Sequence, residues 1–376
     1  MRILFDHQVF SWQTYGGVSR YFVAQMLGLK ALGQEVILPE NFYSENVYLR
    51  SLPDFQRKSL TPFSFKGKKI LQNVLGRKAS LEAIRRYPPD VFHPTYFDPY
   101  FLKTLETRSI RFVLTVHDMI HEIYGHGSRS VFSLDAQVVE NKRFLAGKAD
   151  AIIAVSENTR RDLLRFCPEI DPSKVYVIHH GNSLQPDLEA QNPGSKVQSP
   201  PFLLFVGQRK TYKNFAWMLE QIAGLLHSVK DLELICVGGS HFDKAENEQL
   251  ARLGVAHKVR YQSVGSDAEL AKLYSQAMCF IFPSQYEGFG IPVLEAFACG
   301  CPVVLNRASS LPEVGAEAAS YFDENTSGSL EAEVRRLLED TDYRRNRIEM
   351  GLERVKAFTW EQSAKKHLAV YQTIVN

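Results

Sequence analysis

The stretch that decides the fold runs from Cys279 to Leu305 and reads CFIFPSQYEGFGIPVLEAFACGCPVVL. Two short apolar runs, 279–282 and 302–305, lie on either side of a segment in which Pro292 suits a first helical position. A strand, a helix and a second strand in this order form a βαβ unit, whose strands are parallel in one sheet. We therefore predict an α/β fold.

The same alternation of apolar runs and helical stretches extends over both halves of the chain. The first half has strand candidates at 2–5, 35–38, 91–94, 111–116, 151–155 and 175–179, and helix candidates at 18–32 and 157–166. The second half has strand candidates at 202–206, 232–237, 259–262, 279–282 and 302–305, and a helix candidate at 214–227. This count predicts two Rossmann-like doubly wound domains that face each other across a cleft.

The length of the chain also favours two domains, because 376 residues exceed the size of a typical single core. Proline, glycine and serine are frequent between 185 and 201, where apolar periodicity is nearly absent. We predict a first domain at 1–190, a linker at 191–201, a second domain at 202–357 and a terminal helix at 358–376.

The composition is that of a soluble globular protein, with 45% hydrophobic and 23% charged residues. The chain has 44 basic and 42 acidic residues, and this balance argues against a nucleic-acid-binding protein. Five cysteines in apolar surroundings indicate reduced core residues rather than a metal site. We expect a cytoplasmic protein, because neither a signal peptide nor an apolar run of membrane-spanning length is apparent.

One segment, 57–86, is strongly basic. It has one acidic residue, Glu82, and nine basic ones: Arg57, Lys58, Lys66, Lys68, Lys69, Arg77, Lys78, Arg85 and Arg86. Apolar residues are interleaved with these charges, as in segments that adsorb to anionic lipid. Two interpretations remain open: a contact with the inner face of the cytoplasmic membrane, and a solvated basic surface.

The loop between the two strands of the deciding stretch contains a pair of carboxylates around two glycines. Glu287 lies in the loop, Glu295 lies on the predicted helix, and Gly288 and Gly290 allow a ligand to approach the backbone closely. A helix N-terminus attracts phosphate, and carboxylates beside it can accept hydrogen bonds from sugar hydroxyls. The pattern suits a sugar nucleotide, although acidic residues near a helix N-terminus can also simply offset the helix dipole.

Two cations follow the strand at 202–206. Arg209 and Lys213 lie just before a predicted helix, where they can clamp a pyrophosphate, and the alternative is a basic surface loop. Such a clamp stabilises a departing nucleoside diphosphate, so we expect no metal cofactor. Asp340-Thr-Asp342 is an Asp-x-Asp pattern, but we expect it to cap a helix rather than to bind a metal-diphosphate.

Other candidates lie at strand ends. His117 ends the strand at 111–116, where it serves either as a ligand contact or as the partner of a neighbouring carboxylate. Gly16 and Gly17 form a tight turn that lacks the spacing of a dinucleotide fingerprint. Tyr261 and Gln262 end the strand at 259–262.

The segment 280–323 resembles the donor-site signature of the retaining GT-B glycosyltransferases of glycosyltransferase family 4. The resemblance rests on the paired glutamates and on the motifs Cys299-Gly-Cys-Pro302 and Leu311-Pro-Glu-Val314. It implies that Glu287 contacts the transferred sugar, Glu295 the ribose, and Arg209 and Lys213 the diphosphate. The catalytic set implied is Glu287, His117, Arg209 and Lys213. The donor-binding set implied is Gly16, Gly17, Gly207, Arg209, Lys213, Tyr261, Gln262, Glu287, Gly288, Phe289, Gly290, Ile291 and Glu295. In this family the terminal helix packs back on the first domain.

The segments 5–10 and 15–22 look like those of bacterial mannosyltransferases that build surface polysaccharide, such as O-antigen or exopolysaccharide, on a lipid carrier. This likeness implies GDP-mannose as donor and a glycan or polyprenyl-linked acceptor. The family resemblance implies retention, which can arise by double displacement or by same-face attack, and we expect same-face attack. The alternatives are a UDP-sugar-dependent transferase of the same fold and a two-lobed nucleotide- or sugar-binding protein without transfer activity. An oxidoreductase is disfavoured because neither domain has a dinucleotide fingerprint.

Overall fold

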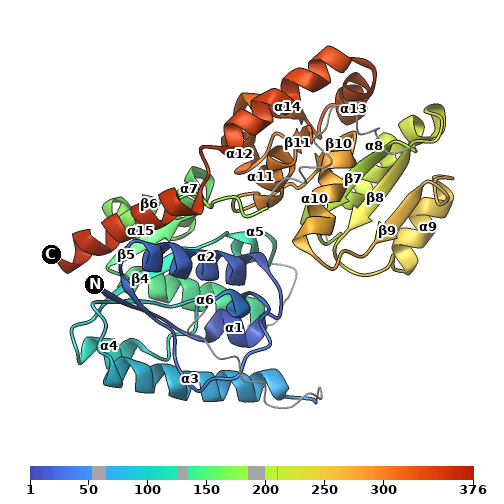
Figure 1. The fold of residues 1–376 in the computed structure, drawn as a ribbon. Helices are drawn as coiled ribbons and strands as arrows, with labels where there is room; N and C mark the ends of the chain where they lie inside the picture. The colour runs from blue at the N-terminus through green and yellow to red at the C-terminus, as the bar shows by residue number, and fades with distance from the viewer. Residues whose placement is uncertain (53–64, 126–133, 185–199, 210) are drawn as a thin grey trace. The chain divides into compact units, whose positions relative to one another are not determined.

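The computed structural model describes residues 1–52, 65–125, 134–184, 200–209 and 211–376. These residues form two compact units (Figure 1). One unit consists of Met1–Gly181 with Trp360–Asn376, and the other of Asn182–Thr359. Except for residues 200 and 201, the predicted linker lies outside the described residues, as does the predicted domain end at 190.

The first unit contains a six-stranded parallel sheet in the order β2-β1-β3-β4-β5-β6. Its strands are β1 (Arg2–Phe5), β2 (Glu35–Ile37), β3 (Val91–His93), β4 (Arg111–Val116), β5 (Ala151–Ala154) and β6 (Val175–Val177). Its helices are α1 (Gln8–Trp12), α2 (Gly17–Ala31), α3 (Lys68–Arg86), α4 (Leu102–Glu106), α5 (Ile120–Tyr124), α6 (Leu134–Lys148), α7 (Glu157–Phe166) and α15 (Trp360–Val375). Every strand predicted in the first half is present, with ends that differ by two residues or fewer.

The terminal helix α15 packs beside α2 within the first unit (Figure 1). Gly28 of α2 allows close approach, since a Cβ there would lie 2.6 Å from the Cβ of Ala364. Polar contacts then fix the register of the two helices. The Tyr21 hydroxyl lies 2.7 Å from His367 Nε2, and Gln25 donates to Ser363 Oγ at 2.7 Å. Because these groups are buried, their hydrogen bonds specify where α15 lies.

The second unit contains another six-stranded parallel sheet, in the order β12-β11-β10-β7-β8-β9. Its strands are β7 (Phe202–Val206), β8 (Glu233–Val237), β9 (Val259–Gln262), β10 (Cys279–Phe282), β11 (Val303–Asn306) and β12 (Ser320–Phe322). Its helices are α8 (Phe215–Ser228), α9 (Lys244–Arg252), α10 (Asp267–Gln276), α11 (Ile291–Ala298), α12 (Leu311–Gly315), α13 (Ser329–Glu339) and α14 (Thr341–Val355). The edge strand β12 is the one strand of this sheet that the sequence analysis does not predict.

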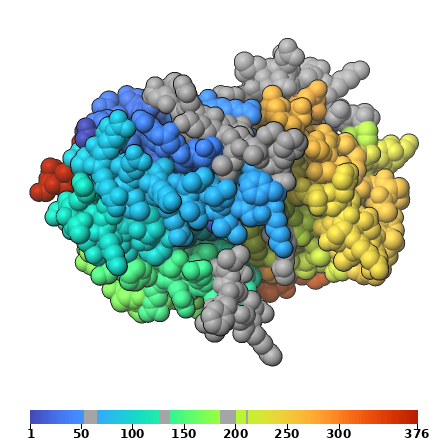
Figure 2. All heavy atoms as spheres, turned by 90° about the horizontal axis from the view of Figure 1, so that it is seen from below, coloured from blue at the N-terminus to red at the C-terminus, as the bar shows by residue number. Residues whose placement is uncertain are grey.

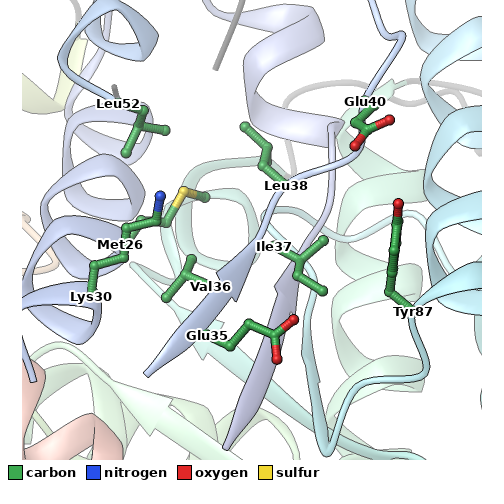
Figure 3. Close-up of a pocket in the computed structure, with 9 residues that line it drawn as sticks. All are labelled: Met26, Lys30, Glu35, Val36, Ile37, Leu38, Glu40, Leu52 and Tyr87. Carbon is green, nitrogen blue, oxygen red and sulfur yellow. The ribbon is translucent and has the colours of Figure 1, made fainter. Parts of the chain in front are cut away.

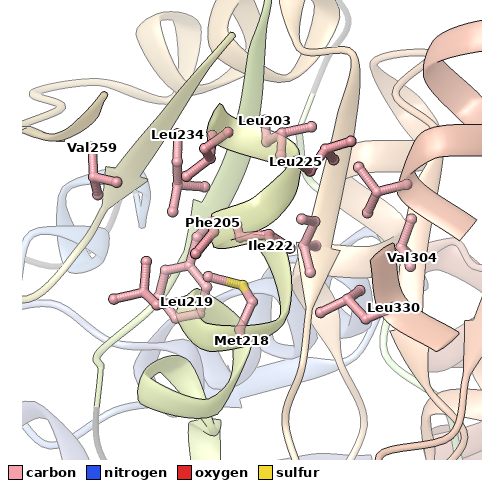
Figure 4. Close-up of a cluster of buried hydrophobic side chains, with 14 of the residues drawn as sticks. Leu203, Phe205, Met218, Leu219, Ile222, Leu225, Leu234, Val259, Val304 and Leu330 are labelled. Atoms are coloured by element: carbon pink, nitrogen blue, oxygen red, sulfur yellow. The ribbon is translucent and has the colours of Figure 1, made fainter. Parts of the chain in front are cut away.

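The core of the second unit forms where α8 packs on the sheet (Figure 4). Its buried residues recur at the three- and four-residue spacing of one helix face: Phe215, Met218, Leu219, Ile222 and Leu226. They contact strand residues such as Leu203 and Phe205, which are fully buried. This packing anchors the start of α8, and with it the loop that follows β7.

Several smaller predictions can be checked directly. All five cysteines are buried and unpaired, as expected for core residues. Asp340 caps α14 by accepting a hydrogen bond from the backbone N–H of Tyr343 at 2.8 Å, which confirms the capping interpretation of the Asp-x-Asp pattern. Among the described residues, no helix is both long and apolar enough to cross a membrane.

Candidate active site

The sheet of the second unit has a topological switch point between β7 and β10. From β7 the chain proceeds to β8 on one side, whereas β10 and the later strands lie on the other. Loops at the carboxyl ends of such neighbouring strands diverge and leave room for a ligand. The two loops here are 207–214, after β7, and 283–290, after β10, and they contain Lys213 and Glu287.

Lys213 and Glu287 meet at this point. Lys213 Nζ lies 2.5 Å from Glu287 Oε1, and the two side chains are only 15% and 11% exposed. The ammonium group also lies 5.3 Å from the centres of the Tyr212 and Phe282 rings. A cation and a carboxylate from separate sequence motifs thus form a largely buried ion pair. The pair lies at the carboxyl edge of the sheet, where α/β sheets bind ligands.

The loop containing Glu287 is held by two serines after β11. The backbone N–H of Glu287 donates to Ser309 Oγ, and Ser310 Oγ donates to the carbonyls of Glu287 and Phe289, each at 2.9 Å. Ser309 adopts a left-handed conformation with φ 51°, which is uncommon for a residue with a side chain. Such local strain, supported by buried hydrogen bonds, is typical of functional loops.

The same loop leads into α11. Gly290 precedes this helix with φ 107°, and a Cβ there would lie 3.1 Å from Leu311 Cδ2, so glycine suits both the backbone and the packing. No side chain caps α11, and Pro292 is in its first turn. The start of the helix at Ile291, beside Lys213 and Glu287 in the fold, can therefore accept an anion on its backbone N–H groups.

Glu295 lies farther along α11 and is 6% exposed. Burial and the nearby Glu295 carboxylate together raise the pKa of Tyr274 well above its ordinary value. Glu295 is thus a buried carboxylate beside a neutral phenol. Its predicted contact with a ribose is not tested by this geometry.

Arg209 has different partners from those the sequence suggests. Its side chain is 4% exposed, and each of its three nitrogens donates to the protein: Nε to Glu246 Oε1 at 2.7 Å, Nη1 to the Gly238 carbonyl at 3.0 Å and Nη2 to the Ser240 carbonyl at 2.5 Å. The guanidinium also lies 4.9 Å from the centre of the Phe242 ring. In this structure Arg209 therefore joins the β8 loop to α9, and its predicted contact with a diphosphate stays a prediction.

The predicted base-contacting residues lie on the edge strand β9. The Tyr261 ring is 4.8 Å from the His241 ring and 5.8 Å from the guanidinium of Arg209. Gln262 accepts a hydrogen bond from Arg260 at 2.8 Å. Gly207, at the end of β7, has φ 144° and no atom within 4 Å of a hypothetical Cβ. These residues line the carboxyl edge of the same sheet.

The predicted residues of the first unit belong to its own sheet edge. His117 directly follows β4, and its ring centre lies 4.9 Å from that of Tyr21 and 6.0 Å from that of His180. Burial lowers the pKa of His117 to about 4, so the ring is neutral at pH 7. Its Nε2 is buried and has no hydrogen-bond partner among the described residues, while the neighbouring Asp118 carboxylate favours the charged ring and so opposes the effect of burial on the pKa.

The glycine pair lies at the start of α2. Gly16 precedes the helix in an extended conformation, and a Cβ there would meet the flexible end of Gln13 at 2.5 Å. A Cβ on Gly17 would meet no atom within 4 Å. Folding of the described residues therefore does not require glycine at 17.

A cavity of about 290 Å³ in the first unit is separate from all these residues (Figure 3). It lies against the edge strand β2 and is lined by Met26, Lys30, Glu35, Val36, Ile37, Leu38, Glu40, Leu52 and Tyr87. None of the predicted site residues lines it.

Sequence reasoning missed the residues that hold the candidate site together. They are Asn214, Gln285, Ser309, Ser310 and Glu324 in the loops, and Glu246, which binds Arg209. Asn214 and Gln285 stand next to or near predicted residues, so their positions in the sequence were a usable signal. Glu324 follows the unpredicted strand β12 and had none.

Two family models match the chain. "Glycosyltransferase Family 4" matches residues 15–185 and "Glycosyl transferases group 1" matches residues 188–354. Together they extend over most of both units. The family resemblance of the donor-site motifs is thereby confirmed.

Similar proteins agree with this. The chain is 24% identical over 401 residues to the O-antigen chain mannosyltransferase B of Escherichia coli, covering 100% of both chains. Its fold is similar to that of sucrose-phosphate synthase from Thermosynechococcus elongatus, with a TM-score of 0.74, 20% identity, and 99% and 98% of the two chains covered. It is also similar to Anabaena HepE in complex with UDP and glucose, with a TM-score of 0.70, 15% identity, and 98% and 99% covered.

Proposed function

We propose a specific reaction for this chain, which belongs to the GT-B glycosyltransferases: it transfers mannose from GDP-mannose to a hydroxyl of a glycan or lipid-linked acceptor, with retention of anomeric configuration. The observation that carries the proposal is the Lys213–Glu287 pair at the switch point, beside the start of α11. The full-length similarity to an O-antigen mannosyltransferase supports mannose as the sugar.

The pair suits the junction between the sugar and the diphosphate of such a donor. Lys213 and the first N–H groups of α11 would bind phosphate oxygens, while Glu287 accepts hydrogen bonds from sugar hydroxyls. The bond that breaks joins the anomeric carbon to a phosphate oxygen, so the bound donor would separate the two side chains and place this bond between them. Charge that develops on the departing GDP is then stabilised by Lys213.

We propose same-face attack for the transfer step. The acceptor oxygen forms a bond to the anomeric carbon as the bond to the β-phosphate oxygen breaks, and that departing oxygen takes the acceptor proton. The protein contributes orientation and charge stabilisation rather than a nucleophile. Since Lys213 and backbone N–H groups supply the positive field, we propose that the reaction needs no divalent cation.

The test is a transfer assay with a panel of sugar nucleotides and a lipid-linked glycan acceptor. GDP-mannose should give product and release GDP, EDTA should leave the rate unchanged, and NMR of the product should show the α-anomer of the donor retained. Lys213→Met should weaken GDP binding. Transfer from a UDP-sugar but not from GDP-mannose would reject the proposed donor, and inverted product would reject same-face attack.

We also propose that the outer face of α3 docks on an anionic membrane, where a lipid-linked acceptor would be found. Three apolar side chains of its first turns point to solvent, with Ile70 64% exposed, Leu71 41% and Val74 43%. Exposed basic residues accompany them: Lys66, Lys69, Arg77, Lys78, Arg85 and Arg86. The light-blue atoms of this helix lie on the face seen in Figure 2. Exposed apolar side chains flanked by cations suit an anionic lipid surface.

The face is smaller than the predicted segment 57–86. Ile84 is fully buried in the first unit, and Lys68 is buried in an ion pair with Glu45. Arg57 and Lys58 lie outside the described residues. Residues of the basic segment therefore lie both in the core and on the surface of the first unit.

Co-sedimentation with vesicles tests the membrane proposal. Replacing Ile70, Leu71 and Val74 by serine should abolish binding to phosphatidylglycerol vesicles without loss of secondary structure. A control that changes Leu27, an exposed residue of α2, to serine should bind normally. Unchanged binding of the triple variant would reject the α3 face as the docking surface.

A further inference from the structure

Glu324 lies just after β12, at the same carboxyl edge of the sheet as the candidate active site. One of its oxygens, Oε2, accepts two hydrogen bonds: from Asn214 Nδ2 at 2.9 Å and from Gln285 Nε2 at 3.0 Å. A carboxylate oxygen can accept more than one bond, and bonds to a charged acceptor are stronger than neutral ones. Glu324 thus joins two amide side chains from different loops.

Each of the two amides is next to a residue of the ion pair. Asn214 directly follows Lys213 and begins α8 in a left-handed conformation, φ 55°. Gln285 precedes Glu287 by two residues, and its backbone N–H donates to the Tyr212 carbonyl at 2.8 Å. The loops after β7 and β10 are therefore hydrogen-bonded to each other. Glu324, in the loop after β12, is hydrogen-bonded to both of them.

We infer that Glu324 is a positioning residue, which holds the loops of Lys213 and Glu287 side by side so that both side chains can contact one donor molecule. This inference rests on the proposed function. Glu324 is bonded to the neighbours of the pair and to neither member in the described contacts, so it acts through the backbone of the two loops. Misplacement of reacting groups by about 1 Å can reduce an enzymatic rate about a hundredfold.

Glu324→Ala removes both hydrogen bonds and is the first test. We expect kcat/KM for transfer from GDP-mannose to fall about tenfold to a hundredfold, while α8 and β10, which are anchored by the core, keep the unit folded. The matched control is Glu248→Ala on α9, an exposed glutamate paired only with Lys244 at 3.8 Å among the contacts described. That variant should retain the wild-type rate.

Glu324→Gln is the conservative variant. Its amide oxygen can still accept from both Asn214 and Gln285 but lacks the charge, so its rate should stay within about threefold of wild type, by the modest difference between neutral and charged bonds. A rate as low as that of Glu324→Ala, in a protein with the wild-type melting temperature, would overturn the positioning role.

A double-mutant cycle distinguishes positioning from a general structural effect. If Glu324 acts through Lys213 and Glu287, then Glu324→Ala should cost less activity in a Lys213→Met background than in the wild-type protein, because coupled residues are non-additive. Fully additive losses would overturn the inference.

If wild-type protein transfers sugar and Glu324→Ala does so equally well, only this inference fails. If wild-type protein neither binds nor transfers a sugar nucleotide, the proposed function fails with it.

Discussion

Arg209→Lys separates the role that the sequence predicts for Arg209 from the role that the structure shows. The guanidinium donates from all three nitrogens to Glu246, Gly238 and Ser240. Lysine has one nitrogen and can keep at most part of this set. The Gly238 carbonyl is half-buried and the Ser240 carbonyl is exposed, so water can partly replace the donors that are lost. We therefore expect a loss of about 1–3 kcal/mol in the free energy of unfolding.

The measurement has two parts. Calorimetry without ligand should show a melting temperature lower by at least about 2 °C, since 1 kcal/mol corresponds to about 2–4 °C for domains of this size. Isothermal titration with GDP at a temperature where the variant is folded should give a Kd within about threefold of wild type, because the Arg209 nitrogens donate to Glu246, Gly238 and Ser240 in this structure. The control is Arg252→Lys on α9, an exposed arginine paired with Glu220 at 2.8 Å, which should change neither quantity.

The opposite pattern would refute this reasoning. An unchanged melting temperature with GDP binding weaker by more than tenfold would mean that Arg209 leaves Glu246 and binds the diphosphate, as the sequence motif suggests. The two outcomes are therefore distinguished both by the melting temperature and by the Kd for GDP.

Three further predictions follow from the described contacts. Glu287→Ala should not weaken GDP binding, because it frees Lys213 from the ion pair, but turnover should collapse. Equal loss of GDP affinity by calorimetry and of turnover by rate assay would contradict the assignment of phosphate binding to Lys213 and sugar contact to Glu287. Gly17→Ala adds a Cβ that meets no atom within 4 Å, so stability should be unchanged or slightly higher, and a large loss of transfer rate with a normal melting temperature would locate a ligand at that turn. Burial lowers the pKa of His367 to about 4, below the value near 6.5 of an unfolded chain, so the unfolded state binds the proton first and stability falls as pH drops from about 6.5 to about 4. Urea titrations should show a loss of about 2 kcal/mol from this histidine at pH 5 relative to pH 8, and His367→Gln, which cannot titrate, should lose less than wild type.

Local sequence was sufficient for most of the fold because apolar strands buried in parallel sheets have a strong signature. Strands such as β4, β7 and β10 have the predicted bounds. The exception, β12, reads Ser-Tyr-Phe and has no β-branched residue, whereas β2, β3 and β6, which are equally short, each contain valine. Its absence from the prediction also hid Glu324, whose role depends on its position in space.

The sequence predicted those parts of the site that depend on residues next to a strand end. It did not predict the parts that depend on how the elements pack. Glu287 and Lys213 each follow a predicted strand, so their meeting at the sheet edge could be expected. Whether a cation is free or already bound cannot be read from a loop sequence. Arg209 is bound because Glu246 lies on α9 and the Gly238 carbonyl follows β8, contacts that only the folded unit brings together.

The Lys213–Glu287 ion pair should affect how strongly the donor and the product nucleotide bind. In this structure Lys213 and Glu287 satisfy each other, which avoids leaving a largely buried charge unpaired. A diphosphate that binds Lys213 gives that cation a second anionic partner and releases Glu287 to accept hydrogen bonds. GDP alone leaves the released carboxylate without a sugar hydroxyl, whereas the intact donor supplies one. The pair therefore favours binding of the sugar nucleotide over the product nucleotide, and this preference should disappear in Glu287→Ala.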